Sequence, residues 1–400
     1  MVMEQGLSSQ SRLILTGLGA LLVSAVASSI AGVYLGSARE VLALIPGLMV
    51  LLPSIIDMRG NIAGVLASRL SSSMHLGEFS IDFEEGTVLG DNVRASFVIT
   101  VLIAFVLGIF AYAASLLSGL PTVSITDLVL ISVTSGIVSG LLVMGITLLI
   151  ALISYRYGLD LDMIGAPTVT TSGDVVTLPI LVLSAVFVMY LPPWARLALG
   201  VAVVAVAVAV ILYTRRRSEG IGTIVGENLS FLIPLSVFGT LAGLTYSLNL
   251  DALVTIAAFL ILIPPFTGIL GSIGGILGSR LSTGMHTGEL NPSFLPERGV
   301  VHHFIISYLY TLILLPLLAL IAHGAAVLMG LNSPGLGMLV AISLAAGLVV
   351  MTLVNGVAYV TASLSFRYGL DPDNFGVPVI TSLIDLIGAA ALVTAIGLLL

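Results

Sequence analysis

Long apolar stretches separated by short polar segments run along almost the whole chain. An apolar stretch of about 18 or more residues with few charges is typical of a membrane-spanning helix. We therefore predict an all-α polytopic protein whose main partner is the lipid bilayer. The eleven predicted spans cover residues 13–35, 41–68, 93–119, 125–152, 163–191, 195–213, 223–246, 251–278, 300–329, 335–362 and 374–399.

One segment of mixed polarity occurs twice, 211 residues apart. The first copy reads SYRYGLDLDMIGAPTVTTSGD and ends at Asp174, and the second reads SFRYGLDPDNFGVPVITSLID and ends at Asp385. Upstream, ASRLSSSMHLGE at 67–78 matches GSRLSTGMHTGE at 278–289 in eight of twelve positions. A fixed offset over this length indicates duplication of a whole module. We expect one five-helix repeat within residues 1–192 and a second within 223–400, forming a pseudo-dimer in one chain that works as a monomer.

The apolar stretch at 195–213 has no counterpart in the other half, so residues 193–222 are predicted to form a joining transmembrane helix. Five helices joined directly to five would invert the second half, and one more span restores its orientation. We therefore predict parallel halves related by a pseudo-twofold axis along the membrane normal. With the N-terminus inside and the C-terminus outside, ten of the 13 basic residues, all arginines, lie on the inner side, as the positive-inside rule expects.

Each copy of the duplicated segment carries one carboxylate inside an apolar run. Asp174 follows Pro167 by seven residues, and Asp385 follows Pro378 by seven. The two prolines are expected at helix starts, where a missing N–H has little effect. Burying a charge in lipid costs about 2.5–3.5 kcal/mol, so an ionisable residue there is a functional-site hypothesis.

Two carboxylates at one register of two parallel repeats are predicted to face each other across the axis. Close carboxylates repel unless a cation or a proton lies between them. A divalent cation suits this pair, and Mg²⁺ in particular binds through one or two carboxylates while keeping several waters. The alternative is that Asp174 and Asp385 each cap a helix break or pair within their own half.

Hydroxyl side chains near these carboxylates are candidates to hydrogen-bond the waters of a hydrated ion. Small hydroxyl residues also serve as packing elements in membrane helices, which is the alternative role. Oxygen ligands favour Mg²⁺, Ca²⁺ or Mn²⁺ over softer metals. The supporting hydroxyls are Thr170, Thr171, Thr381 and Ser382.

Further candidate ligands lie toward the inner side. His75 and Glu78 recur as His286 and Glu289. Three residues apart, each pair is able to share a helix face and form a metal site at the inner mouth. The alternative is that each pair is solvated or braces a loop at a helix end.

The sequence DMRGN at 57–61 breaks the repeat, since it aligns with GILGS at 268–272. Asp57 is predicted either to add a carboxylate to the main site, to bind a coupling ion such as Na⁺, or to form a structural pair with Arg59. Residues two apart on a helix do not face each other, which weighs against the pair.

The amino-acid composition excludes several further kinds of site and function. The chain is 58% hydrophobic and 8% charged, and its mean hydropathy is +1.20. It contains no cysteine, which excludes disulfides, thiolate metal sites and cysteine nucleophiles. The net charge of −7 gives no indication of nucleic-acid binding.

The motifs as a set resemble a known family. The tandem halves, the Pro-x₃-(Asp/Gly)-x₂-Gly-(Asn/Ser) pattern of each second helix, the ASRLS run and the Pro-x₆-Asp helix resemble the MgtE integral membrane domain. The duplicated form in one chain is similar to the solute-carrier 41 family of magnesium transporters. The resemblance covers nearly the whole chain except the joining helix, and the cytosolic sensing domains of the bacterial relatives are not expected here.

The resemblance implies Mg²⁺ transport across the cell (plasma) membrane, with Asp174 and Asp385 contacting a hydrated ion. It also places Asn61 at the family's Gly-Asn position, where Ser272 stands in the second half. Channel activity and Na⁺-coupled exchange both remain open, because the bacterial relatives indicate the first and the solute carriers the second.

Two rival functions belong to other classes. Two membrane aspartates are able to form the acid–base dyad of an intramembrane aspartyl protease, but both aspartates occupy the same repeat position, which suits a symmetric ion site better. An ion-coupled organic-solute transporter would need a roomier site with aromatic or arginine contacts. We therefore predict a divalent cation transporter and no enzyme.

Overall fold

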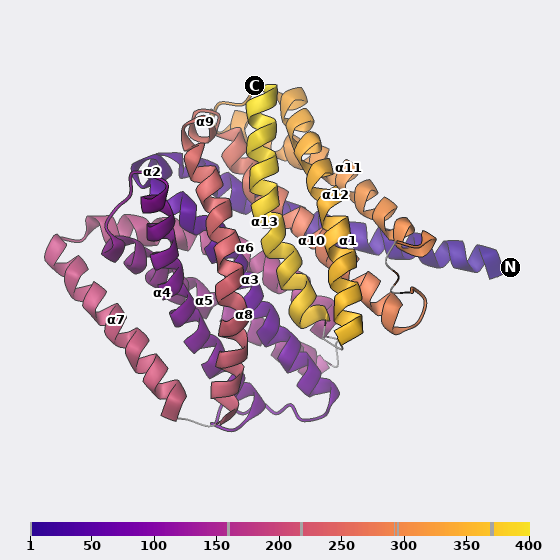
Figure 1. The fold of residues 1–400 in the computed structure, drawn as a ribbon, viewed down its shortest axis with the longest axis horizontal. Helices are drawn as coiled ribbons and strands as arrows, with labels where there is room; N and C mark the ends of the chain where they lie inside the picture. Colours follow the sequence, from indigo (N-terminus) through magenta and orange to yellow (C-terminus); the bar gives the residue numbers. More distant parts are fainter. Residues whose placement is uncertain (1, 158–160, 217–218, 292, 294–295, 369–371) are drawn as a thin grey trace. The chain divides into compact units, whose positions relative to one another are not determined.

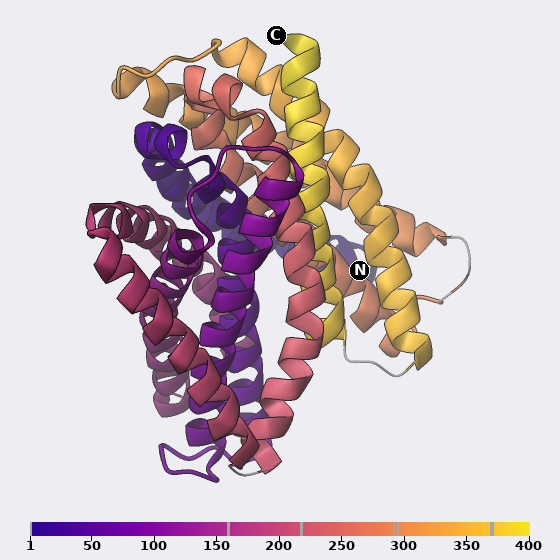
Figure 2. The ribbon, with the colours of Figure 1, turned by 60° about the vertical axis from the view of Figure 1, so that its left-hand side comes forward.

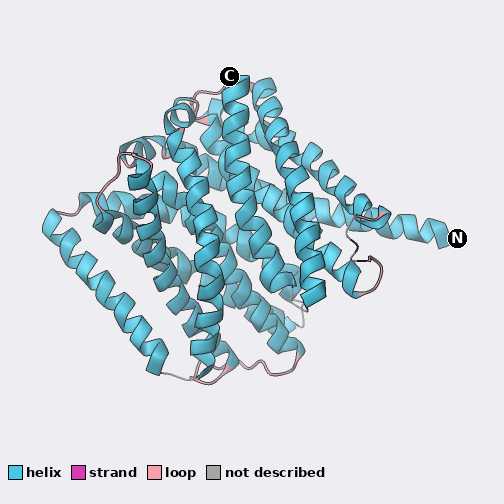
Figure 3. Ribbon diagram, in the orientation of Figure 1, coloured by secondary structure: helices cyan, strands magenta, loops and turns pink. Residues whose placement is uncertain are grey.

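The computed structural model describes residues 2–157, 161–216, 219–291, 293, 296–368 and 372–400. These residues form helices and loops, with no strand among them (Figure 3). The helices, labelled in Figure 1, are α1 (Val2–Ser37), α2 (Arg39–Leu44), α3 (Pro46–His75), α4 (Val88–Leu117), α5 (Ile125–Tyr157), α6 (Leu161–Tyr190), α7 (Pro193–Arg216), α8 (Glu219–Leu248), α9 (Leu250–Thr255), α10 (Ala258–His286), α11 (Arg298–Leu328), α12 (Leu336–Tyr368) and α13 (Pro372–Leu399).

Eleven of these helices are long and apolar enough to cross a membrane. The all-α class and the count of eleven spans are thereby confirmed for the described part of the chain. The two short helices, α2 and α9, are the ones without such a span.

The second span of each half begins later and ends later than expected. The expected spans 41–68 and 251–278 each start with a separate short helix, and the long helices α3 and α10 then run on to His75 and His286. Proline favours the first turn of a helix because it has no N–H to leave unsatisfied. Pro46 therefore starts α3 directly after Ile45, whose φ of −130° and ψ of 74° interrupt the helical path.

The break before α10 is held by the loop between α11 and α12. The Ala258 N–H donates to the carbonyl oxygen of Asn332 at 3.2 Å. The Asn332 side chain in turn donates from Nδ2 to the carbonyl oxygen of Thr255 at 3.0 Å. A long-range contact of this kind leaves no local signal in the sequence at 255–258.

The expectation that Pro167 and Pro378 start their helices is wrong. Helix α6 begins at Leu161 and α13 at Pro372, so each proline lies in the second turn. A proline there removes the hydrogen bond to the carbonyl four residues earlier. The Thr381 hydroxyl, three residues further along α13, donates to the Pro378 carbonyl oxygen over 3.1 Å.

The described chain forms two compact units. Unit 1 contains Met1–Gly36 and Thr255–Leu400, and unit 2 contains Ser37–Val254. Helix α1 thus belongs with α10–α13, and α8 belongs with α3–α6. Within unit 1, α12 and α13 run side by side (Figure 2). The repeat ranges 1–192 and 223–400 stay a prediction, and the units place the first helix of each repeat with the later helices of the other.

Small residues make the close contacts of this exchange possible. A Cβ at Gly32 of α1 would overlap the backbone carbonyl of Ile261 on α10, and a Cβ at Gly243 of α8 would overlap that of Val50 on α3. The two contacts are the same contact 211 residues apart. Small residues let membrane helices approach closely, and here each first helix packs against the second helix of the other repeat.

Helix α7 packs within unit 2 against α4 and α5. Its contact with α5 includes Gly200, where a Cβ would lie 2.6 Å from Thr126 Cγ2. Leu197, Val201 and Val204 are exposed. An exposed apolar helix face of this kind suits contact with lipid. The role of this helix in restoring the orientation of the second repeat stays a prediction.

An ion pair joins α3 to α8 in unit 2, between Arg69 Nη2 and Glu227 Oε2 at 2.8 Å, and the two side chains are 33% and 59% exposed. Exposed pairs contribute about 0–1 kcal/mol. We expect Glu227→Gln to lower the thermal unfolding midpoint in detergent only slightly, with less effect at high salt. A large salt-independent loss would contradict the view that water screens this pair.

Candidate cation site

The two repeated carboxylates lie on equivalent helices of the two units. Asp174 is on α6 in unit 2, Asp385 is on α13 in unit 1, and both are half-buried. In unit 2, α6 packs against α3, and in unit 1, α13 packs against α10. Each unit thus packs the fifth helix of one repeat, which carries the carboxylate, against the second helix of the same repeat.

In unit 2 the contact between α3 and α6 falls beside the carboxylate. A Cβ at Gly173 would lie 3.9 Å from Arg59 Cβ, an ordinary van der Waals distance. Asp57 and Asn61 flank Arg59 on the same stretch of α3, and both are half-buried. The structure therefore brings the stretch that breaks the repeat next to the helical turn of Asp174.

In unit 1 the equivalent contact is between α10 and α13. A Cβ at Gly271 would lie 3.8 Å from Thr381 Cγ2, one helical turn before Asp385. Ser272 is half-buried, and its hydroxyl donates to the Gly268 carbonyl oxygen at 2.8 Å. Its hydroxyl proton is therefore used within the helix, but a hydroxyl oxygen can still accept a hydrogen bond from a water of a hydrated ion.

Among the other supporting hydroxyls, Ser382 is fully buried and Thr381 is half-buried. The side chains of Thr170 and Thr171 lie outside the described part of the structure. The roles of all four hydroxyls stay predictions.

The helix-face argument for the inner-side pairs is wrong. Gly77 and Gly288 have φ of +74° and +77°, a left-handed conformation that commonly ends helices. Helices α3 and α10 therefore stop at His75 and His286. Glu78 and Glu289 lie in the loops that follow, so neither pair shares a continuous helix face.

His286 has contacts of its own at the end of α10. Its Nδ1 lies 2.9 Å from the Ser282 carbonyl oxygen, and its ring meets Phe366 edge-on, with centroids 5.2 Å apart. His75, Glu78 and Glu289 are exposed. Among the described residues no three His, Cys, Asp or Glu side chains are grouped as metal ligands. A metal site at the inner mouth stays a prediction.

Arg59 is the residue whose importance the sequence reasoning missed. Its side chain is only 1% exposed. Nη1 lies 3.4 Å from Thr100 Oγ1, and Nε and Nη2 have no hydrogen-bond partner among the described residues. The sequence signal for Arg59 is the break in the repeat at 57–61, which also contains Asp57.

Comparison with known proteins agrees with the duplication. The family model MgtE, described as a divalent cation transporter, matches residues 52–184 and 263–395. Both the starts and the ends of these two matches are 211 residues apart, which confirms the offset predicted from the motifs.

Solute carriers are similar over most of the chain. Solute carrier family 41 member 3 of Mus musculus is 26% identical over 367 residues, covering 86% of this chain and 74% of its own. Solute carrier family 41 member 2 of Homo sapiens is 24% identical over 384 residues, covering 88% of this chain and 64% of its own.

A solved structure of an inward-facing multidrug resistance MATE family transporter aligns with 96% of this chain and 98% of its own, at 12% identity. Its TM-score of 0.32 is too low to indicate a shared fold. The family model, by contrast, covers more than half of the chain in two copies. This multi-pass membrane protein therefore belongs to the MgtE family of divalent cation transporters.

Proposed function

We propose that this protein carries Mg²⁺ across the plasma membrane, with the ion held between Asp174 and Asp385. One observation supports this proposal above the others. The two carboxylates occupy equivalent positions in the two matched repeats, and each is half-buried on a helix packed against the second helix of its repeat. A pseudo-twofold axis between the repeats would bring the carboxylates to the same depth.

The chemistry of the site favours a hydrated hard cation. Mg²⁺ dehydrates reluctantly and binds through few carboxylates, and the half-buried aspartates leave room for water. Ser272 and Thr381 would accept hydrogen bonds from this water, and Asn61 would contribute an amide oxygen at the equivalent level of the first repeat.

We further propose that transport is coupled to Na⁺, with Asp57 as a ligand for the coupling ion. Asp57 aligns with Gly268, so this carboxylate exists in the first repeat only. It lies on the stretch of α3 that contacts α6 beside Asp174. A coupling ion needs ligands distinct from those of the cargo, and an unrepeated carboxylate meets this need.

Flux into proteoliposomes tests both statements. We expect Mg²⁺ uptake that an outward Na⁺ gradient accelerates. Asp57→Asn should remove the Na⁺ dependence, whereas Asp251→Asn, a change at an exposed carboxylate of α9, should have no effect. An uptake rate that is the same with and without the Na⁺ gradient would indicate a channel. The absence of any divalent cation flux would overturn the assignment of Mg²⁺ as the transported ion.

Family membership excludes one of the two rival functions, and an uptake assay tests the other. Membership of a transporter family sets aside the intramembrane aspartyl protease, and the expectation of no enzyme is confirmed. An organic-solute transporter would show uptake of an organic substrate that competes with Mg²⁺, which the same liposomes would reveal.

A further inference from the structure

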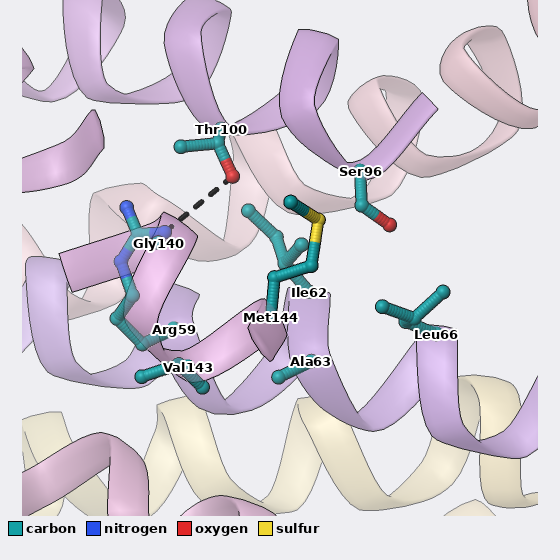
Figure 4. Close-up of a pocket in the computed structure, with 9 residues that line it drawn as sticks. All are labelled: Arg59, Ile62, Ala63, Leu66, Ser96, Thr100, Gly140, Val143 and Met144. Carbon is teal, nitrogen blue, oxygen red and sulfur yellow. Dashed lines mark hydrogen bonds between the residues drawn. The ribbon is translucent and has the colours of Figure 1, made fainter. Parts of the chain in front are cut away.

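A small cavity lies inside unit 2, between α3, α4 and α5 (Figure 4). Its volume is about 10 Å³, roughly the space that a single water-sized particle requires. Apolar side chains such as Ile62 and Met144 form much of the wall, and the polar lining groups are Arg59, Ser96 and Thr100.

The guanidinium of Arg59 lines this cavity and lacks a full set of partners among the described residues. It is buried, and its hydrogen bond to Thr100 is long at 3.4 Å. Among the described residues, Nε and Nη2 have no hydrogen-bond partner, and no carboxylate forms an ion pair with the guanidinium. An uncompensated buried charge is strongly destabilising. A water would satisfy an N–H group without neutralising the charge, whereas an anion does both.

Two glycines of α5 leave space for the guanidinium of Arg59. A Cβ at Gly140 would overlap Arg59 Nη1, and a Cβ at Gly136 would lie 3.5 Å from Nη2. Glycine at position 140 therefore makes room for the cation. Thr100 accepts the Arg59 hydrogen bond, which leaves its own hydroxyl proton to donate.

The second repeat lacks this arrangement. At the equivalent positions, 211 residues on, Leu270 replaces Arg59, Met351 replaces Gly140, and Asn355 replaces Met144. In unit 1 the hydroxyl of Ser307, the equivalent of Ser96, donates to Asn355 Oδ1 at 2.8 Å. The side chain of Asn355 thus supplies an acceptor there. In unit 2 a methionine stands at that position, and the cavity lies beside the cation.

We propose that this cavity binds one small monatomic anion, a halide such as chloride. The Arg59 guanidinium, whose Nη1 lies beside the lining residue Gly140, offsets its charge, and the hydroxyls of Ser96 and Thr100 donate to it. Cavity size selects a single atom over carboxylate or phosphate ligands. The site belongs to the first repeat alone.

Halide binding has a consequence for transport, and this step rests on the proposed function. Arg59 contacts α6 at Gly173, next to Asp174. A bound anion offsets the positive field of Arg59 at that carboxylate, so halide and Mg²⁺ strengthen each other's binding. Such coupling is reciprocal by thermodynamic necessity.

Binding of ³⁶Cl⁻ to the purified full chain, without divalent cations, tests the site directly. We expect saturable binding of one halide per chain. The paired change Arg59→Leu with Gly140→Met, which copies the packing of the second repeat, should weaken it at least tenfold. Asn355→Met, the matched change in unit 1, should leave it intact. Equal binding by wild type and the paired variant would overturn the proposal, as would no saturable binding by wild type.

A second measurement uses wild type alone, so its outcome does not depend on whether the paired variant folds. Crystals of wild type grown in bromide should show one anomalous peak at the Arg59 guanidinium, and a map without it would overturn the site.

For the coupling, the Mg²⁺ concentration for half-maximal flux should be several-fold lower in chloride than in gluconate. Halide binding without Mg²⁺ transport would preserve the site and reject the cargo. Transport that is equal in both salts would reject the coupling.

Discussion

Replacing both Asp174 and Asp385 with asparagine should abolish Mg²⁺ flux into proteoliposomes. Each carboxylate would accept charge-assisted hydrogen bonds from the waters of the ion, worth about 1.5–3 kcal/mol apiece. Asparagine keeps the size of the side chain but removes the charge. Loss of one carboxylate should therefore weaken ion binding about 10- to 100-fold, and loss of both by 100-fold or more.

The repeat supplies the control for this prediction. Because the two positions are equivalent, Asp174→Asn alone and Asp385→Asn alone should reduce flux to a similar degree. Asp251→Asn removes an exposed carboxylate and should leave flux unchanged. Undiminished flux in the double variant would move the cation site elsewhere, with Asp57 as the next candidate.

Alanine at Gly32 or Gly243 should destabilise the fold through the exchanged helices. Each added Cβ would meet a backbone carbonyl, of Ile261 or Val50 respectively, which is unable to move aside without its helix. Overpacking of this kind costs about 1–3 kcal/mol. We expect a clearly lower thermal unfolding midpoint for either variant, as measured by circular dichroism in detergent.

Two other glycines on the same helices serve as matched controls. A Cβ at Gly19 of α1 or at Gly226 of α8 would meet no atom within 4 Å. Alanine is a better helix former than glycine by about 0.5–1 kcal/mol, so Gly19→Ala and Gly226→Ala should hold or raise the midpoint. Equal midpoints for all four variants would mean that the close contacts of α1 and α8 do not contribute to stability.

The sequence determined the class, the spans and the duplication. Membrane-spanning length and apolarity are local properties of a stretch, and lipid requires each spanning backbone to satisfy its own hydrogen bonds as a helix. The repeated motifs gave the 211-residue offset that the family matches share. The equivalence of Asp174 and Asp385 follows from the same alignment.

Helix ends were harder to predict than helix existence. Apolar character continues through the breaks at Ile45 and Ala257, so a hydropathy pattern joins the short helices to the long ones. The break before Ala258 depends on Asn332, which lies more than 70 residues away in the chain. Gly77 and Gly288 were local signals for helix ends, but their positive φ became visible only in the structure.

Only the tertiary structure decided which helices pack together and what surrounds Arg59. The glycines of α1 and α8 allow another helix to approach closely, but they do not determine which helix this is. Any helix with a complementary surface is able to pack there. The structure assigns Ile261 to Gly32 and Val50 to Gly243, and so exchanges the first helices of the repeats. Likewise, the sequence shows an arginine without a repeat counterpart. Its burial against Gly140 and its lack of a described ion-pair partner follow from the packing of α3 on α4 and α5.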